Sequence, residues 1–419
     1  MLKIIKASNR RAIASLLTHT RTRSTATERR VAKIVGDVRR KGDIALTKYV
    51  RTLDCLEGPL EVTTEEVRDG ASRVDPKVQK ALRTATKHIK RVARKQLPRG
   101  WQTKVAPGIT VEQRVLPLDR VGCYVPGGRF PLPSSLLMTV IPAQIAGVQE
   151  IIVACPRPEP IVLAAALEAG VTRLFRMGGA QAIAALAYGT ETVPRVDKIV
   201  GPGGKFVSIA KSLVSDQTAI DMVAGPTELG IMADASSDPE LVALDLISQA
   251  EHSKDTMCFV ITQSKTMAKQ IQKSIEKLIP GTERSSIIKE SISKNGFIAV
   301  CKNENEMIGL ANEIAPEHME LMVKNAKTLS KKITGAGLLL IGKNTPSSAS
   351  DYLLGTNHIL PTNGFGRTRG GLSVLDFLKL QTVIESKKSG LRKISKSLKV
   401  LTDAEDLPNH YKAVKRRLD

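Results

Sequence analysis

The sequence predicts an α/β protein made of two doubly wound, incomplete Rossmann-like domains, with small helical elements at the N- and C-terminal ends. Short apolar runs alternate with Ala-rich helical stretches between about residues 119 and 232, and a second alternating block follows. Strands that alternate with helices in this way form parallel sheets covered on both faces. The chain has 419 residues, which is enough for two or three domains of ordinary size.

Before the first alternating block, the pattern is helical and strongly charged. In "ATERRVAKIVGDVRRKGDIALTKYVRTLD", apolar residues recur every three or four positions, as on the buried face of an amphipathic helix. The first residues, "MLKIIKASNRRAIASLLTHTRTRST", interleave basic residues with short apolar pieces and lack an apolar core followed by a cleavage site. We therefore expect a basic N-terminal helix, packed amphipathic helices up to about residue 118, and a cytoplasmic protein.

The first alternating block contains three Gly-rich turns between a strand and a helix. They are "YVPGGRFPLPSS", "RMGGAQ" and "VGPGGK". Such turns leave backbone N–H groups free at a helix N terminus, where phosphate binds, although any tight connection also favours glycine. Because no G-x-G-x-x-G fingerprint occurs in the chain, the turns indicate a phosphate-bearing ligand without identifying a dinucleotide.

The second block runs from "TELGIMAD" through "PELVALDLISQAEH", "TMCFVIT" and "GFIAVCK" to "GLLLIG". After "GLSVLDFLK", the last fifty or so residues are charged and helical, and we expect them to reach back to the body or across to a partner. The predicted boundaries are an N-terminal element at 1–24, a first α/β domain at 25–122 and 230–367, a second at 123–229, and a C-terminal element at 368–419.

Composition excludes several classes of protein. The chain has 63 basic and 41 acidic residues, a net charge of +22, which raises the possibility of nucleic-acid binding. Aromatic residues reach only 3%, however, and no zinc-finger, RRM or helix-turn-helix signature is present, so a basic solvated surface explains the charge better. No apolar run approaches the roughly 18 positions of a membrane span. Five scattered cysteines without a C-x-x-C pair predict reduced thiols.

The histidines point to possible chemistry, because four of the six lie in the second half beside carboxylates or amides: His252, His318, His358 and His410. In "ISQAEH", helical spacing places Gln249 and His252 on one face, where a metal would still need about two more ligands. Taken alone, a polar helix end is the simpler interpretation. In "APEHMEL", the adjacent Glu317 and His318 suit two proton-transfer tasks, or else a surface Glu beside a partly buried His.

Several long motifs resemble those of the histidinol dehydrogenase family. They are "RVGCYVPGGRFPLPSSLLMTVIPAQIAG", "MGGAQAIAALAYGTETVPRVDKIVGPGGK", "DMVAGPTELGIMADASSDPELVALDLISQAEH", "NEIAPEHMEL" and "SDYLLGTNHILPT", in the family's order over nearly the whole chain. The resemblance implies a zinc-dependent enzyme of histidine biosynthesis. It would oxidise L-histidinol to L-histidine through L-histidinal and reduce two NAD.

The resemblance also implies roles for single residues. One zinc ion per subunit would be held by Gln249, His252, Asp351 and His410, and the acid–base pair would be Glu317 and His318. Substrate would contact the four zinc ligands together with Thr227, His318, His358 and Glu405. NAD would contact Tyr124, Gln181 and the position of Gly204. The family is an intertwined homodimer, so His410 and Glu405 are expected to complete the neighbouring subunit's site.

The chain departs from the family pattern at three places. Gly204 replaces an Asn that contacts NAD, and Thr227 stands where the family usually has Ser. The segment Asn363–Gly371, "NGFGRTRGG", is more basic and Gly-rich than expected, and its role is open. Two alternatives also remain: a relative that oxidises another small alcohol, such as a sulfonated propanediol, and a nucleic-acid-binding protein on the same scaffold.

Overall fold

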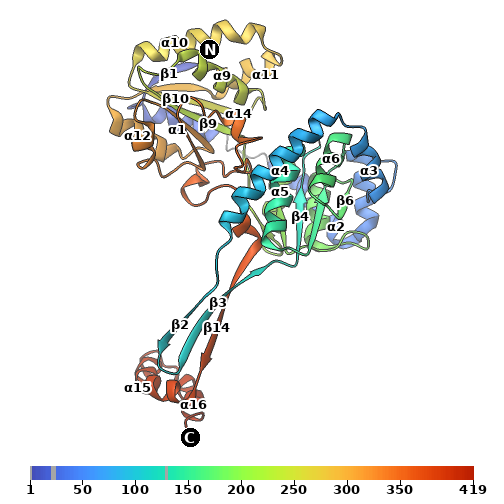
Figure 1. Ribbon diagram of the computed structural model, residues 1–419, viewed down its shortest axis with the longest axis vertical. Helices are drawn as coiled ribbons and strands as arrows, with labels where there is room; N and C mark the ends of the chain where they lie inside the picture. The colour runs from blue at the N-terminus through green and yellow to red at the C-terminus, as the bar shows by residue number, and fades with distance from the viewer. Residues whose placement is uncertain (1, 20–24, 128–130) are drawn as a thin grey trace.

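The computed structural model describes residues 2–19, 25–127 and 131–419. It contains two parallel sheets, each covered by helices, and a long arm that extends away from both (Figure 1). This architecture confirms the predicted α/β class. Among the described residues, no helix combines the length and the apolar character of a membrane span.

The six-stranded sheet has the order β1-β11-β10-β9-β12-β13, with every neighbouring pair parallel. Its strands are β1 (Lys3–Lys6), β9 (Glu228–Ala233), β10 (Met257–Thr262), β11 (Phe297–Val300), β12 (His318–Met322) and β13 (Leu338–Ile341). Its helices are α1 (Arg10–His19), α9 (Pro239–Ala250), α10 (Lys265–Leu278), α11 (Ser285–Asn295), α12 (Glu304–Ile314), α13 (Ala326–Ser330) and α14 (Ser347–Ser350).

The central strands of this sheet are apolar throughout because both of their faces are covered. All six residues of β9 and of β10 are buried, and Phe259 stacks on Phe297 with ring centroids 5.1 Å apart. The N terminus of α9 begins where the Asp238 side chain accepts a hydrogen bond from the backbone N–H of Glu240, with proline at the first helical position. These local signals explain why the second alternating block folds as predicted.

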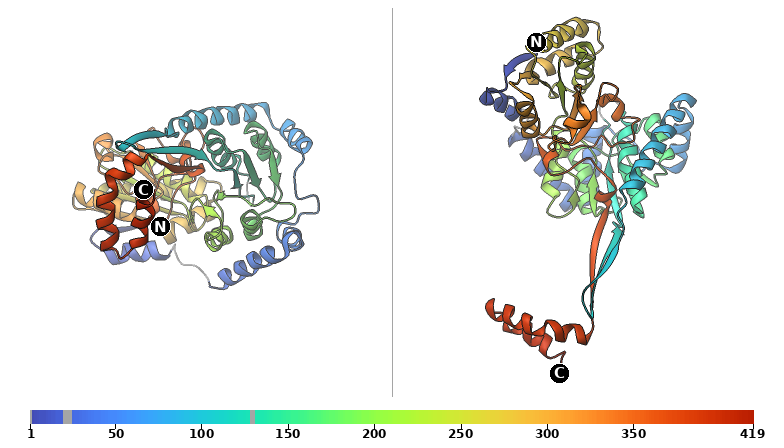
Figure 2. Two further views of the ribbon diagram at one scale, coloured as in Figure 1. Left: turned by 90° about the horizontal axis from the view of Figure 1, so that it is seen from below. Right: turned by 60° about the vertical axis from the view of Figure 1, so that its left-hand side comes forward.

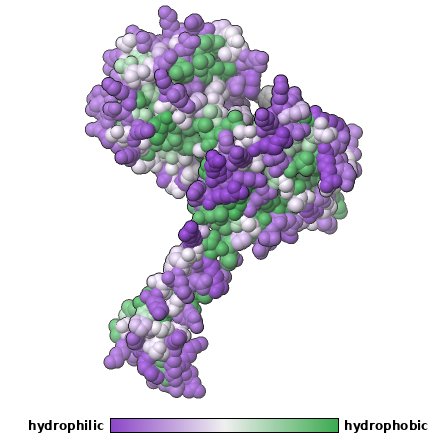
Figure 3. Space-filling view, in the orientation of Figure 1, coloured by the Kyte–Doolittle hydropathy of each residue, from purple (hydrophilic) through white to green (hydrophobic). Residues whose placement is uncertain are grey.

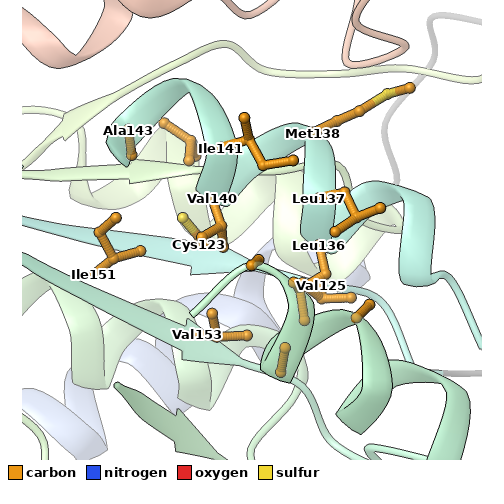
Figure 4. Close-up of a cluster of buried hydrophobic side chains, with 14 of the residues drawn as sticks. Cys123, Val125, Leu136, Leu137, Met138, Val140, Ile141, Ala143, Ile151 and Val153 are labelled. Atoms are coloured by element: carbon orange, nitrogen blue, oxygen red, sulfur yellow. The ribbon is translucent and has the colours of Figure 1, made fainter. Parts of the chain in front are cut away.

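The five-stranded sheet has the order β6-β5-β4-β7-β8, again all parallel. Its strands are β4 (Arg120–Tyr124), β5 (Glu150–Ala154), β6 (Arg173–Phe175), β7 (Lys198–Val200) and β8 (Ala219–Ile220), and its helices are α5 (Pro133–Ala146), α6 (Pro160–Glu168), α7 (Gly179–Tyr188) and α8 (Lys205–Val214). Figure 4 shows Leu137, Val140 and Ile141 of α5 beside Cys123 and Val153 of the sheet. This helix is buried on nearly all sides, so it has no polar face.

The helices before the first sheet belong to a different domain from the one predicted. Three of them pack on the helices of the five-stranded unit. In that unit, α2 (Thr25–Tyr49) packs against α7 and α8, α3 (Thr64–Ser72) packs against α6, and α4 (Pro76–Gln96) packs against α5. The expected grouping of 25–122 with 230–367 is therefore wrong for these helices. Periodicity identifies the apolar face of a helix but not the surface that will cover it.

The N-terminal element is likewise part of a domain. Within 1–24, the described residues form α1 and the strand β1, which is the edge strand of the six-stranded sheet beside β11. Met1 and residues 20–24 lie outside the described residues. This segment was expected to be only helical, because four residues are too few to show strand alternation clearly.

The arm consists of an antiparallel ribbon with a pair of helices at its end (Figure 2). Its strands are β2 (Trp101–Ala106), β3 (Ile109–Pro117) and β14 (Leu378–Ser386), followed by α15 (Lys388–Ala404) and α16 (Pro408–Lys415). The predicted C-terminal helices are confirmed, but residues 101–117 form strands rather than the expected helix. The ribbon joins segments more than 200 residues apart, which no local pattern reveals.

The basic segment Asn363–Gly371 fastens the two α/β units to each other. Arg367 donates hydrogen bonds to the backbone oxygens of Asn312 and Glu313 at the end of α12 in the six-stranded unit. Arg369 donates to the backbone oxygen of Asp221, just after β8 of the five-stranded unit, and to Asp376 Oδ1 at 2.8 Å. Its two arginines thus account for the basic character of this segment.

Candidate active site

A cavity of about 200 Å³ lies between the two α/β units and is lined by residues of both. From the six-stranded unit it receives residues at the amino ends of β9 and β12, at the end of α9, and just after α14. From the other unit it receives the start of α5 and the turn after β7. Seven sequence-predicted residues line this cavity: Thr227, Gln249, His252, Glu317, His318, Asp351 and His358.

The Glu317 carboxylate is held by two residues at the start of β9. Its Oε2 accepts hydrogen bonds from Thr227 Oγ1 at 2.6 Å and from the backbone N–H of Glu228 at 2.8 Å. Gln249 Nε2 in turn donates to Thr227 Oγ1 at 2.8 Å. The Thr227 hydroxyl therefore connects Gln249 to Glu317. The family's usual Ser carries a hydroxyl at this position too, so the change to Thr keeps it.

His318 lies between two carboxylates and is only 2% exposed. Its Nδ1 is 3.3 Å from the backbone oxygen of Glu228, and its Nε2 is 3.5 Å from Asp351 Oδ1. Burial lowers the pKa of His318, but the negative charges of Glu317 and Asp351 outweigh burial and raise the pKa to about 9. For Glu317, burial raises the pKa, and the positive charge of His318 offsets part of this rise.

Desolvation by the surrounding protein lowers the pKa values of the other two histidines of the cavity, the half-buried His358 and the more exposed His252, so the neutral imidazole is favoured. His358 Nε2 lies 3.0 Å from Ser135 Oγ of α5, and its Nδ1 lies 3.0 Å from the backbone oxygen of Asp351. His358 therefore joins the two α/β units at the cavity. Neutral imidazole is the form that ligates a metal, and because both ring nitrogens of His358 already have partners, His252 is the better candidate.

The donor atoms of three residues in the cavity fit a metal site. Gln249, His252 and Asp351 supply oxygen and nitrogen donors to one cavity. Asp351 Oδ1 is buried without a hydrogen-bond partner among the described residues, and the cationic group facing it is His318 Nε2 at 3.5 Å, so this oxygen suits a cation. In that same part of the chain, no three His, Cys, Asp or Glu side chains gather closely enough to hold a metal.

Two predicted residues lie far from this cavity in the same chain. Glu405 follows α15 and His410 lies in α16, both at the end of the arm, and both are exposed. They are the residues expected to serve a neighbouring subunit.

The predicted NAD contacts lie at the carboxyl end of the five-stranded sheet. Tyr124 ends β4, and its hydroxyl accepts a hydrogen bond from the backbone N–H of Gly179 at 3.1 Å. Burial raises the pKa of Tyr124 to about 12, so the phenol stays protonated. Gly204 precedes α8, and an added Cβ there would meet no atom within 4 Å. Packing therefore does not require glycine at 204. Residues 128–130 of the first Gly-rich turn lie outside the described residues.

Asp54 is a residue of this region that the sequence did not indicate. Its Oδ2 accepts hydrogen bonds from Gln181 Nε2 and from the backbone N–H of Gly178, both at 2.9 Å. Asp54 therefore orients the Gln181 amide and occupies the N terminus of α7. The only local signal is the position of Asp54 at the end of the short helix Val50–Asp54. The next residue, Cys55, ends that helix with a φ of 56°.

Comparison with known proteins gives a consistent result over the whole chain. The family profile described as histidinol dehydrogenase matches residues 17–418. Histidinol dehydrogenase of Methylococcus capsulatus is 41% identical over 411 residues, covering 96% of this chain and 94% of the relative. The protein of that name from Oceanobacillus iheyensis is 42% identical over 393 residues, with 92% of each chain covered. The crystal structure of histidinol dehydrogenase from Elizabethkingia anophelis has a TM-score of 0.91 at 32% identity, covering 95% of this chain and 93% of that chain.

Proposed function

Because the chain belongs to the histidinol dehydrogenase family, an oxidoreductase family, we propose that it oxidises L-histidinol to L-histidine through L-histidinal with NAD and zinc. The observation that carries this proposal is the cavity itself. It brings together the buried Glu317–His318 pair at the start of β12, Gln249 and His252 at the end of α9, and Asp351 just after α14. Every relative named above is a histidinol dehydrogenase, so neither another small alcohol nor nucleic acid has comparable support.

Gln249, His252 and Asp351 would hold the zinc ion. When bound, zinc would orient polar atoms of the substrate and share the negative charge of Asp351, which in the protein alone helps to raise the pKa of His318.

Two proton transfers fit the two members of the acid–base pair. His318 Nδ1–H donates to the backbone oxygen of Glu228, so in the neutral ring Nε2 is the atom that accepts a proton. In the proposed first oxidation, Nε2 takes the hydroxyl proton of L-histidinol while hydride leaves its carbon for NAD. In the second, Glu317 takes a proton from the water that adds to L-histidinal, and the resulting hydrate gives hydride to a second NAD.

We further propose a homodimer in which the arm supplies Glu405 and His410 to the partner's cavity. Large apolar side chains are exposed on this arm, and Figure 3 shows hydrophobic surface near its end. Among them are Val105, Leu380, Ile384, Val400 and Leu401, which are between 58% and 68% exposed. Isolated apolar residues on a surface are ordinary, but this many on one projecting arm favour a covering partner.

Subunit mixing tests this arrangement directly. His318→Ala damages the body of the site and His410→Ala damages the arm. In a mixed dimer one site would then carry both changes and the other neither, giving about one quarter of wild-type activity after random mixing. No recovery of activity would contradict the shared site.

The function itself is tested by counting reduced cofactor. Purified protein with zinc and L-histidinol should release two NADH for each L-histidine formed, and a chelator should abolish the reaction. No NADH from L-histidinol would refute the proposal. A cytoplasmic location also remains our proposal, and five free cysteines, four of them buried, agree with it.

A further inference from the structure

Glu228 carries a buried carboxyl group next to the acid–base pair, and none of the roles proposed above involves this group. It begins β9 between β10 and β12, and it is 3% exposed. It does not line the cavity, although Thr227 before it does. Its side chain therefore cannot act on substrate directly.

The two oxygens of the Glu228 side chain hold two separate segments. Oε2 accepts a hydrogen bond from the backbone N–H of Glu317 at 3.2 Å, and Oε1 accepts one from the backbone N–H of Asn363 at 3.0 Å. Asn363 follows Thr362, which lines the cavity and accepts a hydrogen bond from the backbone N–H of Gly225 at 2.6 Å. One carboxyl group thus connects the turn before β12 to the segment that contributes Thr362 to the cavity.

The backbone of Glu228 contacts the same pair from the other direction. Its N–H donates to Glu317 Oε2 at 2.8 Å, and its carbonyl oxygen is 3.3 Å from His318 Nδ1. The contacts between Glu228 and Glu317 are therefore reciprocal, since the backbone N–H of each residue reaches the carboxyl group of the other. This arrangement sets both the position of the Glu317 carboxyl and the ring nitrogen that His318 presents to the cavity.

We propose that Glu228 is a positioning residue for the reaction, because its carboxyl group holds the backbone of Glu317 and so aligns the Glu317–His318 pair with the bound substrate. The inference rests on the proposed roles of Glu317 and His318. It adds that a residue outside the cavity controls the rate of the chemical steps while leaving the binding of substrate and metal intact.

The test is Glu228→Gln, which keeps the shape of the side chain. A glutamine has one acceptor oxygen, so its NH₂ group must face one of the two backbone N–H donors, and that donor loses its partner. Because small misplacements of reacting groups reduce rates strongly, we expect kcat to fall about 10- to 100-fold. The KM for L-histidinol, the Kd for NAD and the bound zinc should stay within about threefold of wild type, since the proposed ligands are untouched.

The matched control is Glu320→Gln on β12. Glu320 is 1% exposed and accepts a hydrogen bond from the backbone N–H of Ser347 at 2.7 Å, which glutamine can also accept. Its kcat is expected to remain within about threefold of wild type. If both variants lost kcat equally, the effect would belong to any buried carboxyl group and the proposal would be overturned.

Other outcomes separate this inference from the proposed function. If wild-type protein makes no NADH from L-histidinol, the proposed function fails and this inference fails with it. If wild type is active and Glu228→Gln keeps its kcat, only the positioning role fails. A fall in kcat together with loss of zinc would indicate general damage and also overturn it. Should Glu228→Gln not fold, Glu228→Asp keeps the carboxyl group but is one methylene shorter, and it should show the same loss of kcat at unchanged KM.

Discussion

Removing the Lys211 ammonium group should destabilise the five-stranded unit strongly. Lys211 of α8 and Asp221 form an ion pair whose side chains are 3% and 0% exposed. Lys211 Nζ also donates to the backbone oxygen of Gly201 at 2.9 Å, and Asp221 Oδ2 accepts from the backbone N–H of Gly201 at 2.8 Å. The pair therefore holds both backbone groups of the residue that begins the "GPGGK" turn beside the cavity.

The size of the effect follows from this burial. Lys211→Met leaves the Asp221 carboxylate buried without its cation, and breaking a buried pair from one side costs about 3–5 kcal/mol. Each kcal/mol lowers the unfolding midpoint of a unit of this size by about 2–4 °C, so the expected shift is about 6–20 °C. The double variant Lys211→Met/Asp221→Asn removes both charges and should recover part of the loss.

Thermal unfolding followed by far-UV circular dichroism measures this shift. The control is Lys205→Met at the start of the same helix, where the pair with Asp255 spans 3.5 Å and its side chains are 72% and 51% exposed. Solvent screens that pair, so we expect little change in the midpoint. A midpoint for Lys211→Met equal to that of Lys205→Met would show that the buried pair does not stabilise the fold.

Three further changes have defined outcomes. Glu317→Gln should slow oxidation of L-histidinal more than oxidation of L-histidinol in single-turnover assays, and equal losses would contradict the proposed division of proton transfers. Burial, together with the nearby Asp245, raises the pKa of Glu320. Wild-type protein should therefore lose folding stability as the pH rises from the pKa of the unfolded chain to that of the folded protein. Glu320→Gln avoids this loss, so its stability in urea unfolding should rise relative to wild type between about pH 5 and 9. Phe259→Ala removes a fully buried ring stacked on Phe297 and should cost about 3–5 kcal/mol, whereas a loss under about 1 kcal/mol in the same assay would imply that the core closes around the gap.

Much of the candidate site could be predicted because its signals are local. The spacing predicts Gln249 and His252 on one helical face; Gln249 lies in the last turn of α9 and His252 follows the helix, yet both line the cavity. The motif "ISQAEH" alone did not distinguish a metal site from a polar helix end. Its neighbours in the cavity, Asp351 above all, support the metal, and they are about a hundred residues away in sequence.

Residues that act through the backbone were not predictable. Asp54 and Glu228 accept hydrogen bonds from backbone N–H groups of segments at least 89 residues away. A backbone donor leaves no trace in the sequence, so an acidic residue that will meet one looks like any other acidic residue.

The α/β class, the two alternating blocks and the residue types of the chemistry follow from the sequence alone, because hydrophobic periodicity and turn residues act within a few positions. The three-dimensional arrangement was needed to show which sheet covers α2, α3 and α4, and that residues 101–117 pair with β14 in an arm. It also placed the cavity between the amino ends of β9 and β12 and the carboxyl end of the five-stranded sheet. The meeting of these ends depends on how two units pack, and packing is settled by contacts between distant segments that periodicity does not record.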